Sequence, residues 1–197
     1  MEKPADTPHD LHPLLRGRWS PRAFSTEPIT REELASLLEA ARWAPSCFNE
    51  QPWRFIVALR EEAHFAALLS CLAEKNQAWA KDSAALVLSV AKTTFSHNDK
   101  PNRHAAHDVG LATMQLVLQG EALGIRAHQM AGFSAERARE VFAIPEGFEP
   151  LTAIALGNPG SPDTLPADLA ERERTPRTRK DAPELFFGGS FGDAWSR

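Results

Sequence analysis

The longest helical pattern in the sequence lies between residues 102 and 123, and its middle has no polar face. Apolar side chains occupy every side of this part of the helix: Val109, Leu111, Ala112, Met114, Leu116, Val117 and Leu118. A helix that is apolar all round has to be buried all round. In a chain of 197 residues, such a helix must lie either at the centre of the domain or at a subunit interface.

Short apolar runs elsewhere in the chain have the length and composition of β-strands. Residues 53–59 are aromatic and β-branched, and residues 151–156 form a run that ends at Gly157. Residues 84–91 are nearly all apolar, as expected for a strand that is covered on both faces. Residues 128–133 form either a loop or a further short strand.

Three further helices are expected. Thr30 and Glu33 form a capping box, so a buried helix starts there and runs to about Trp43. Residues 62–75 carry apolar side chains at helical spacing and predict one helix. Ser134 is a suitable N-cap for a helix that ends near residue 142.

The length and composition fit one domain with loose ends. Residues 1–13 are polar and contain three prolines, so they are expected to form a flexible arm. Residues 14–197 are expected to form a single domain, with a Pro-rich, charged C-terminal extension that starts at about residue 161.

The charge and the cysteine content narrow the possible partners. A net charge of -4 and a pI near 6.0 give no reason to expect nucleic acid or an anionic membrane, and no apolar run approaches a membrane span. The chain has only Cys47 and Cys71 and no secretory signal, which favours a reduced, cytoplasmic setting over a disulfide framework. Any anion-binding site must therefore come from a local cluster of basic residues rather than from the net charge.

The stretch 44–53 has an unusual composition for a connection between a helix and a strand. It reads Ala-Pro-Ser-Cys-Phe-Asn-Glu-Gln-Pro-Trp. Its two prolines fix φ and remove backbone donors, so the loop is stiff, and Ser46, Asn49 and Gln51 add short hydrogen-bonding groups to that frame. The alternatives are a binding loop and a turn that only links two elements.

Patterns for metal, thiol or nucleotide-loop chemistry are weak. His104 and His107 would share a helix face, but no His-Glu-x-x-His pattern and no paired cysteines accompany them, so a surface or interface histidine pair is favoured over a metal site. Cys47 lacks the signature of a cysteine hydrolase and is interpreted as a buried or wall cysteine. The chain also lacks the glycine-rich phosphate loops.

Arginines gather in two segments at opposite ends of the chain, 16–22 and 172–180. The first segment alone fits either a solvated basic patch or a clamp for phosphate or carboxylate. Together, on an acidic protein, the two segments indicate an anion, for which phosphate is a good candidate. The polar loops 44–52 and 128–132 could then hydrogen-bond a flat, polar ring.

Two of these stretches resemble signatures of the FMN-dependent nitroreductase family. Residues 18–24, Arg-Trp-Ser-Pro-Arg-Ala-Phe, are similar to its Arg-x-Ser-x-Arg-x-Phe opening. Residues 44–55 are similar to its Ala-Pro-Ser-x-x-Asn-x-Gln-Pro-Trp-x-Phe signature. Further similarities follow at Asn76, 108–112, Gly124, 132–133, 157–159 and 177–179, so the resemblance covers residues 14–192.

The resemblance implies an α+β fold with a central mixed or antiparallel sheet flanked by helices. It also implies a homodimer that holds two FMN molecules at the subunit interface. The long buried helix would lie at that interface, and the C-terminal extension would reach onto the partner subunit.

The resemblance also assigns cofactor-binding residues. Those expected at the phosphate, the ribityl chain and the ring edge are Arg18, Trp19, Ser20, Arg22, Arg177 and Arg179, with Arg172 and Arg174 as a competing C-terminal pair. Those expected at the isoalloxazine are Asn76, Gln129, Met130, Ala131 and Gly132. Those expected to come from the partner subunit are Pro45, Ser46, Asn49 and Gln51.

The implied activity is electron transfer from NADH or NADPH to a nitroaromatic, a quinone or a similar electron-poor small molecule, with ping-pong kinetics. No catalytic side chain and no metal are expected, because the flavin carries the hydride chemistry. The alternatives are a specialised flavoenzyme of the same fold, such as a dehalogenase, an enal reductase or an enzyme that consumes its own reduced flavin, and a flavin-binding interaction protein without turnover.

Overall fold

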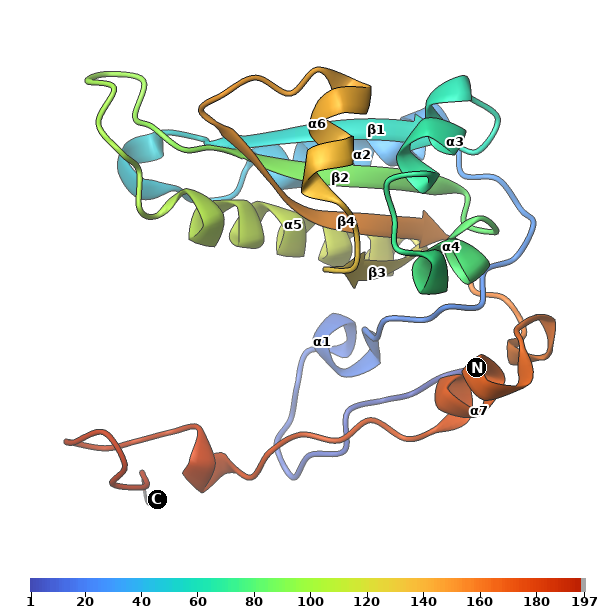
Figure 1. The fold of residues 1–197 in the computed structure, drawn as a ribbon. Helices are drawn as coiled ribbons and strands as arrows, with labels where there is room; N and C mark the ends of the chain where they lie inside the picture. The colour runs from blue at the N-terminus through green and yellow to red at the C-terminus, as the bar shows by residue number, and fades with distance from the viewer. Residues whose placement is uncertain (196–197) are drawn as a thin grey trace.

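A single four-stranded sheet forms the centre of the molecule in the computed structural model, which describes residues 1–195 (Figure 1). The strands are β1 (Trp53–Leu59), β2 (Ala85–Lys92), β3 (Arg126–Met130) and β4 (Phe148–Gly157). Their order is β1-β2-β4-β3, and each neighbouring pair is antiparallel. The α+β prediction is confirmed, and the sheet is antiparallel rather than mixed. Residues 196 and 197 of the expected domain lie outside the described residues.

Helices cover both faces of this sheet (Figure 1). On one face lie α2 (Arg31–Arg42) and α5 (Ala105–Ala122), and on the other lie α3 (Ala63–Leu69), α4 (Glu74–Ala80) and α6 (Ala135–Phe142). Successive side chains of β2 alternate between the two cores: Val87 packs into the first and Leu88 into the second. This explains the continuous apolar run, because a strand covered on both faces needs apolar residues at every position.

The N-terminus of α2 has the expected capping box. The Glu33 N–H donates to Thr30 Oγ1 at 3.1 Å, and the Thr30 N–H donates to Glu33 Oε2 at 2.7 Å. The two bonds satisfy donors that have no partner inside the helix. The start of α2 is therefore fixed by residues within one turn of sequence.

The long helix α5 is buried on one side only. Ala112 and Leu116 are fully buried against the sheet and α2, whereas Leu111 and Met114 are half-buried and Gly110 is exposed. An apolar outer face therefore remains along this helix within the chain. Its place in a subunit interface remains a prediction.

The prediction of a single helix over residues 62–75 is wrong. The chain instead forms α3 and α4, separated by residues 70–73. The Ala73 N–H donates to the Gly132 carbonyl at 2.9 Å, and the Ser134 N–H donates to the Cys71 carbonyl at 2.8 Å. These bonds to a distant loop use the Ala73 N–H and the Cys71 carbonyl, which a continuous helix would pair within itself. The break places Asn76 in the first turn of α4, beside that loop.

The chain ends contain short helices that the sequence analysis did not predict, namely α1 (Pro13–Gly17) and α7 (Ala167–Arg174). Short 3₁₀ turns are also present at η1 (Cys47–Asn49), η2 (Pro162–Thr164) and η3 (Ala182–Glu184). Figure 1 shows α7 beside the N-terminal residues, below the sheet, with the segment after it leading away from the domain. Among residues 1–195, no helix has the length and apolar character needed to cross a membrane.

Candidate functional site

A cavity of about 380 Å³ lies where the two ends of the chain meet. Residues 18–22, the end of α7 and the segment after α7 line it, so the cavity brings together six of the predicted cofactor-binding residues: Arg18, Trp19, Ser20, Arg22, Arg177 and Arg179. Its basic residues are Lys3, Arg18, Arg22, Arg172, Arg177 and Arg179, and its acidic residue is Glu173. A cavity with this charge is suited to bind an anion.

Arg177 joins the two arginine-rich segments. Its guanidinium donates to the carbonyl of Arg16 at 2.8 Å and also to the carbonyl of Arg18. Arg172 and Arg174, the alternative C-terminal pair, lie in different surroundings. Arg172 lines the cavity, whereas Arg174 forms an ion pair with Asp163. Arg177 and Arg179 both line the cavity, and their contact with a phosphate remains a prediction.

Glu173 is a residue of this cavity that no sequence pattern indicates. Its side chain is 1% exposed, and its Oε1 accepts the N–H groups of Arg22 at 2.8 Å and of Ala23 at 3.0 Å. The carboxylate therefore fixes the turn that presents Arg22 to the cavity. In the sequence it is one acid in a charged run, and nothing local distinguishes it from Glu171.

Three residues that line the cavity each contain a buried polar atom without a hydrogen bond to any described residue. These atoms are Trp19 Nε1, Glu173 Oε2 and Arg177 Nε. A buried polar group without a partner costs free energy, so such atoms mark a place where a ligand can complete the hydrogen bonds. Two donors and one acceptor beside several arginines fit a ligand that carries both phosphate and hydroxyl groups.

His128 connects this cavity to the edge strand β3. Its Nδ1 lies 2.9 Å from the Pro21 carbonyl, and its ring lies 4.6 Å from that of Trp79. Burial, with a smaller contribution from Arg22, lowers the pKa of His128 to about 4. The ring is therefore neutral at pH 7, and because a carbonyl can only accept, Nδ1 carries the proton.

Beyond His128, the end of β3 and the start of α4 form an edge around Gly132. The Asn76 Nδ2 donates to the Gly132 carbonyl at 2.9 Å. A side chain at position 132 would place its Cβ 2.7 Å from that nitrogen, so only glycine fits without moving Asn76. Met130 is buried, whereas Gln129 and Ala131 are exposed. The five predicted ring-binding residues therefore lie in one region.

The predicted residues of loop 44–53 do not join this region. Figure 1 shows the loop with η1 at the opposite end of the sheet from α4 and α7. Pro45, Asn49 and Gln51 are exposed, and Ser46 is half-buried. Within one chain, these four residues and the cavity form separate surfaces.

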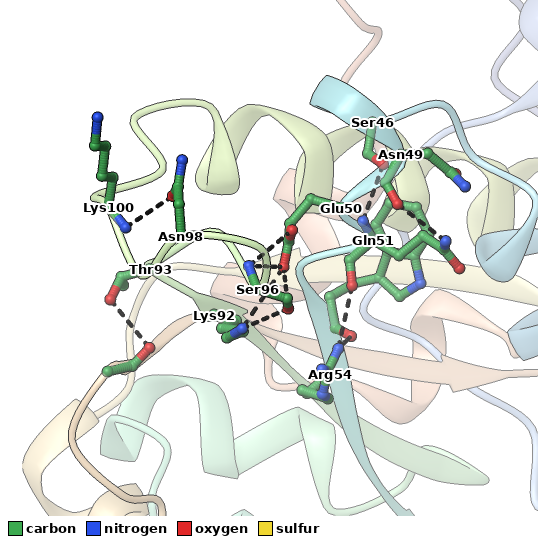
Figure 2. A network of polar contacts seen from close by, with 12 residues as sticks. Ser46, Asn49, Glu50, Gln51, Arg54, Lys92, Thr93, Ser96, Asn98 and Lys100 are labelled. Carbon is green, nitrogen blue, oxygen red and sulfur yellow. Dashed lines mark hydrogen bonds and ion pairs between the residues drawn. The ribbon is translucent and has the colours of Figure 1, made fainter.

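The loop is nevertheless held in a defined and strained conformation. Phe48, Asn49 and Gln51 have left-handed φ values of 53°, 55° and 53°, which are unfavourable for residues other than glycine. The Gln51 N–H donates to Ser46 Oγ at 3.0 Å, as Figure 2 shows. The Cys47 N–H donates to Asp108 of α5 at 2.9 Å.

Glu50 ties the same loop to residues 92–96. Its carboxylate accepts the Ser96 N–H at 3.0 Å and the Ser96 hydroxyl at 2.6 Å, and it lies 3.6 Å from Lys92 Nζ (Figure 2). These hydrogen bonds lower the pKa of Glu50. The loop thus displays its outward side chains from a rigid base.

The histidine pair of the long helix has a local role. His107 Nδ1 lies 3.1 Å from the Asp108 carboxylate that also holds Cys47, and His104 is the N-cap residue of α5. In the described part of the chain, no group of three or more His, Cys, Asp or Glu side chains could hold a metal ion.

The sequence and the fold place this chain in a known family. The profile of the nitroreductase family matches residues 15–158, so the chain belongs to that family. The resemblance seen in its two signatures is thereby confirmed.

Relatives with sequence similarity include proteins of bacteria and archaea. An uncharacterised 15.4 kDa protein of Mycolicibacterium smegmatis is 34% identical over 64% of this chain and 83% of its own length. A protein of Archaeoglobus fulgidus, named as a proposed NADH dehydrogenase/NAD(P)H nitroreductase, is 30% identical over 74% of this chain and 83% of its own length.

Solved structures show the same fold. A crystal structure described as an oxidoreductase containing FMN has a TM-score of 0.91 and 36% identity, and the match covers 95% of this chain and 96% of that one. A nitroreductase family protein of Clostridium difficile 630 has a TM-score of 0.68 and 24% identity, covers 88% of this chain and 95% of its own, and shows the fold alone.

Proposed function

We propose that this chain is an FMN-dependent oxidoreductase that takes electrons from NADH or NADPH and passes them to a nitroaromatic, a quinone or a similar electron-poor small molecule. The observation that carries this proposal is the arginine-lined cavity, which the contact between Pro21 and His128 joins to the strand that leads to Gly132. The family membership supports it, as do the FMN of the structural relative and the NAD(P)H in the name of the archaeal one.

The residues of the cavity have distinct tasks in this proposal. Arg18, Arg22 and Arg179 bind the phosphate, because all three residues line the cavity and a guanidinium group binds phosphate well. Two nitrogens of the Arg177 guanidinium donate to backbone carbonyls, so this residue shapes the phosphate site. Its Nε remains as a donor. Trp19 and Ser20 contact the ribityl chain and the edge of the ring.

At the other end of the site, Asn76 and residues 129–132 hold the edge of the ring system. FMN supplies the hydride chemistry when it is bound. The chain therefore has to orient the ring, offer donors at its edge and leave one face open. The electron donor and the acceptor use that face in turn, which gives ping-pong kinetics.

The site is completed by a second copy of the chain. Pro45, Ser46, Asn49 and Gln51 serve the partner's cofactor, because their surface lies far from the cavity of their own chain (Figure 1). Exposed aromatic side chains support an interface here: Phe48 is 84% exposed and Trp43 is 71% exposed. The apolar outer face of α5 and the exposed aromatic residues of the C-terminal extension provide further surface for burial in a homodimer.

Substitution of Arg22 tests the phosphate site directly. Arg22→Ala removes the guanidinium but keeps the backbone N–H that Glu173 accepts. We expect roughly a tenfold or greater loss of FMN affinity and little change for riboflavin, which lacks the phosphate. Titration of the flavin-free protein, followed by flavin fluorescence, measures both affinities, and Arg103→Ala at an exposed position is the control. Unchanged FMN affinity in Arg22→Ala would refute the phosphate site.

Reduction experiments separate this activity from its alternatives. Wild-type protein should be yellow and should be bleached by NADH or NADPH. If the protein is yellow and is reduced by dithionite but not by NADH or NADPH, it binds flavin without this turnover. Failure to reconstitute the protein with FMN would contradict every FMN-dependent activity considered for it. Stopped-flow reoxidation by nitro, quinone and halogenated compounds then identifies the class of acceptor.

A further inference from the structure

The N-terminal residues lie against the arginine-lined cavity in an ordered way. Lys3, Ala5 and Thr7 are half-buried, whereas the residues between them are exposed. This alternation is typical of an extended segment with one side on the protein. The Ala5 N–H donates to the Arg16 carbonyl at 2.8 Å, and Arg16 in turn donates to the His9 carbonyl at 3.2 Å. The arm is therefore attached to the first arginine-rich segment on both sides of Thr7.

This attachment brings the ammonium group of Lys3 to the cavity wall. Its Nζ lies 4.6 Å from the centre of the Trp19 ring, and Lys3 is one of the cavity's lining residues. Among residues 1–195, this ammonium makes no hydrogen bond. A lysine nitrogen has three donors, so they are available to a ligand in the cavity.

The surroundings of Lys3 disfavour its charged form. Burial lowers the pKa of Lys3, Glu173 opposes this shift, and the nearby Arg22 and Arg177 lower the pKa further. The cavity already contains five arginines against one carboxylate. A sixth cation in such a place is repelled by its neighbours, and a bound dianion would turn that repulsion into attraction.

We propose that Lys3 is an anion-binding residue of the cofactor site, and that residues 1–7 form a strap that holds its ammonium at the phosphate of FMN. This inference rests on the proposed function, because it assigns a further ligand to the same site. The chemical partner is a phosphate monoester. These residues belong to segment 1–13, for which the sequence predicts a flexible arm.

A substitution that keeps the packing of Lys3 isolates its charge. Lys3→Met retains an unbranched chain over the Trp19 ring and removes the ammonium, and Lys3→Arg restores a cation. Lys100→Met, at an exposed lysine on another part of the molecule, is the matched control. Full-length flavin-free proteins are titrated with FMN and with riboflavin, and the FMN titration is repeated with competing inorganic phosphate and at several salt concentrations.

We expect Lys3→Met to weaken FMN binding roughly tenfold, to leave riboflavin binding unchanged and to reduce the salt dependence of FMN binding. Lys3→Arg should recover most of the affinity, and inorganic phosphate should compete less well in Lys3→Met than in wild type. Equal losses for FMN and riboflavin would show that Lys3 only packs on Trp19, and unchanged FMN affinity would also overturn the inference. Wild-type protein that binds neither flavin would instead refute the proposed function, and this inference with it.

Discussion

At position 128, a histidine stays neutral in the folded protein because its surroundings disfavour the charged ring. Its pKa falls from 6.5 to about 4 on folding, chiefly through burial. Between these values the unfolded chain holds one more proton than the folded chain, so acid stabilises the unfolded state. The contribution of His128 to stability is complete above pH 6.5 and is lost as the pH falls toward 4.

This residue should give the protein a measurable pH dependence. We expect the free energy of unfolding to fall by about 2 kcal/mol between pH 6.5 and about pH 5 because of His128. His128→Asn places an amide donor near the Pro21 carbonyl and should flatten that slope, whereas His64→Asn, at an exposed site, should keep it. Urea unfolding at several pH values measures the effect, and an identical slope in His128→Asn would contradict the assignment.

At the scale of elements, the rigidity of loop 44–53 depends on Glu50. The Glu50 side chain is 6% exposed and accepts both the N–H and the hydroxyl of Ser96. Glu50→Ala removes the charged acceptor of both donors and should lower the free energy of unfolding by about 1–3 kcal/mol. Glu50→Gln keeps an acceptor and should lose less.

Urea unfolding at neutral pH checks this prediction against Glu61→Ala, which removes an exposed carboxylate nearby in the chain. The same Glu50→Ala variant should also bind FMN more weakly, since the strained residues Phe48, Asn49 and Gln51 lose their anchor. A stability equal to that of Glu61→Ala would show that the network in Figure 2 contributes little.

At the scale of the whole molecule, the proposed site needs two chains, and mixed dimers can test this. Arg22→Ala damages the cavity, and an Asn49→Ala, Gln51→Ala double variant damages the loop. If the loop serves the partner's cavity, a mixed dimer contains one intact site and one site with both defects. Random pairing makes half of the dimers mixed, so co-expression should restore about a quarter of the wild-type sites.

FMN content and NADH-dependent reduction measure this recovery, with each variant expressed alone as the control. No recovery above the two controls would place the loop and the cavity in the same chain. Sedimentation gives the assembly state independently, and a monomeric wild type would exclude the role proposed for residues 45–51.

Local sequence patterns predict several of the helices and strands of this fold. The capping box at Thr30 starts α2, because its hydrogen bonds join residues three positions apart. The apolar run 84–91 predicts a strand covered on both faces, because side chains alternate along a strand whatever lies around it. The two signature stretches, 18–24 and 44–55, identify the family for a similar reason, since each is contiguous in the chain.

Contacts between distant segments were decided only by the tertiary structure. The helix expected over 62–75 breaks because Ala73 and Cys71 bond to residues 132–134, and no local spacing shows that competition. Glu173 and Lys3 reach the cavity because the two chain ends pack together, although each looks like an ordinary surface charge in the sequence. The sequence alone therefore determined the start of α2, the buried strand β2 and the family, because each of these signals lies within a few positions. Burial and hydrogen bonding between residues far apart in the sequence, such as Asn76 with Gly132 and Arg22 with Glu173, decided how the elements and the site are assembled.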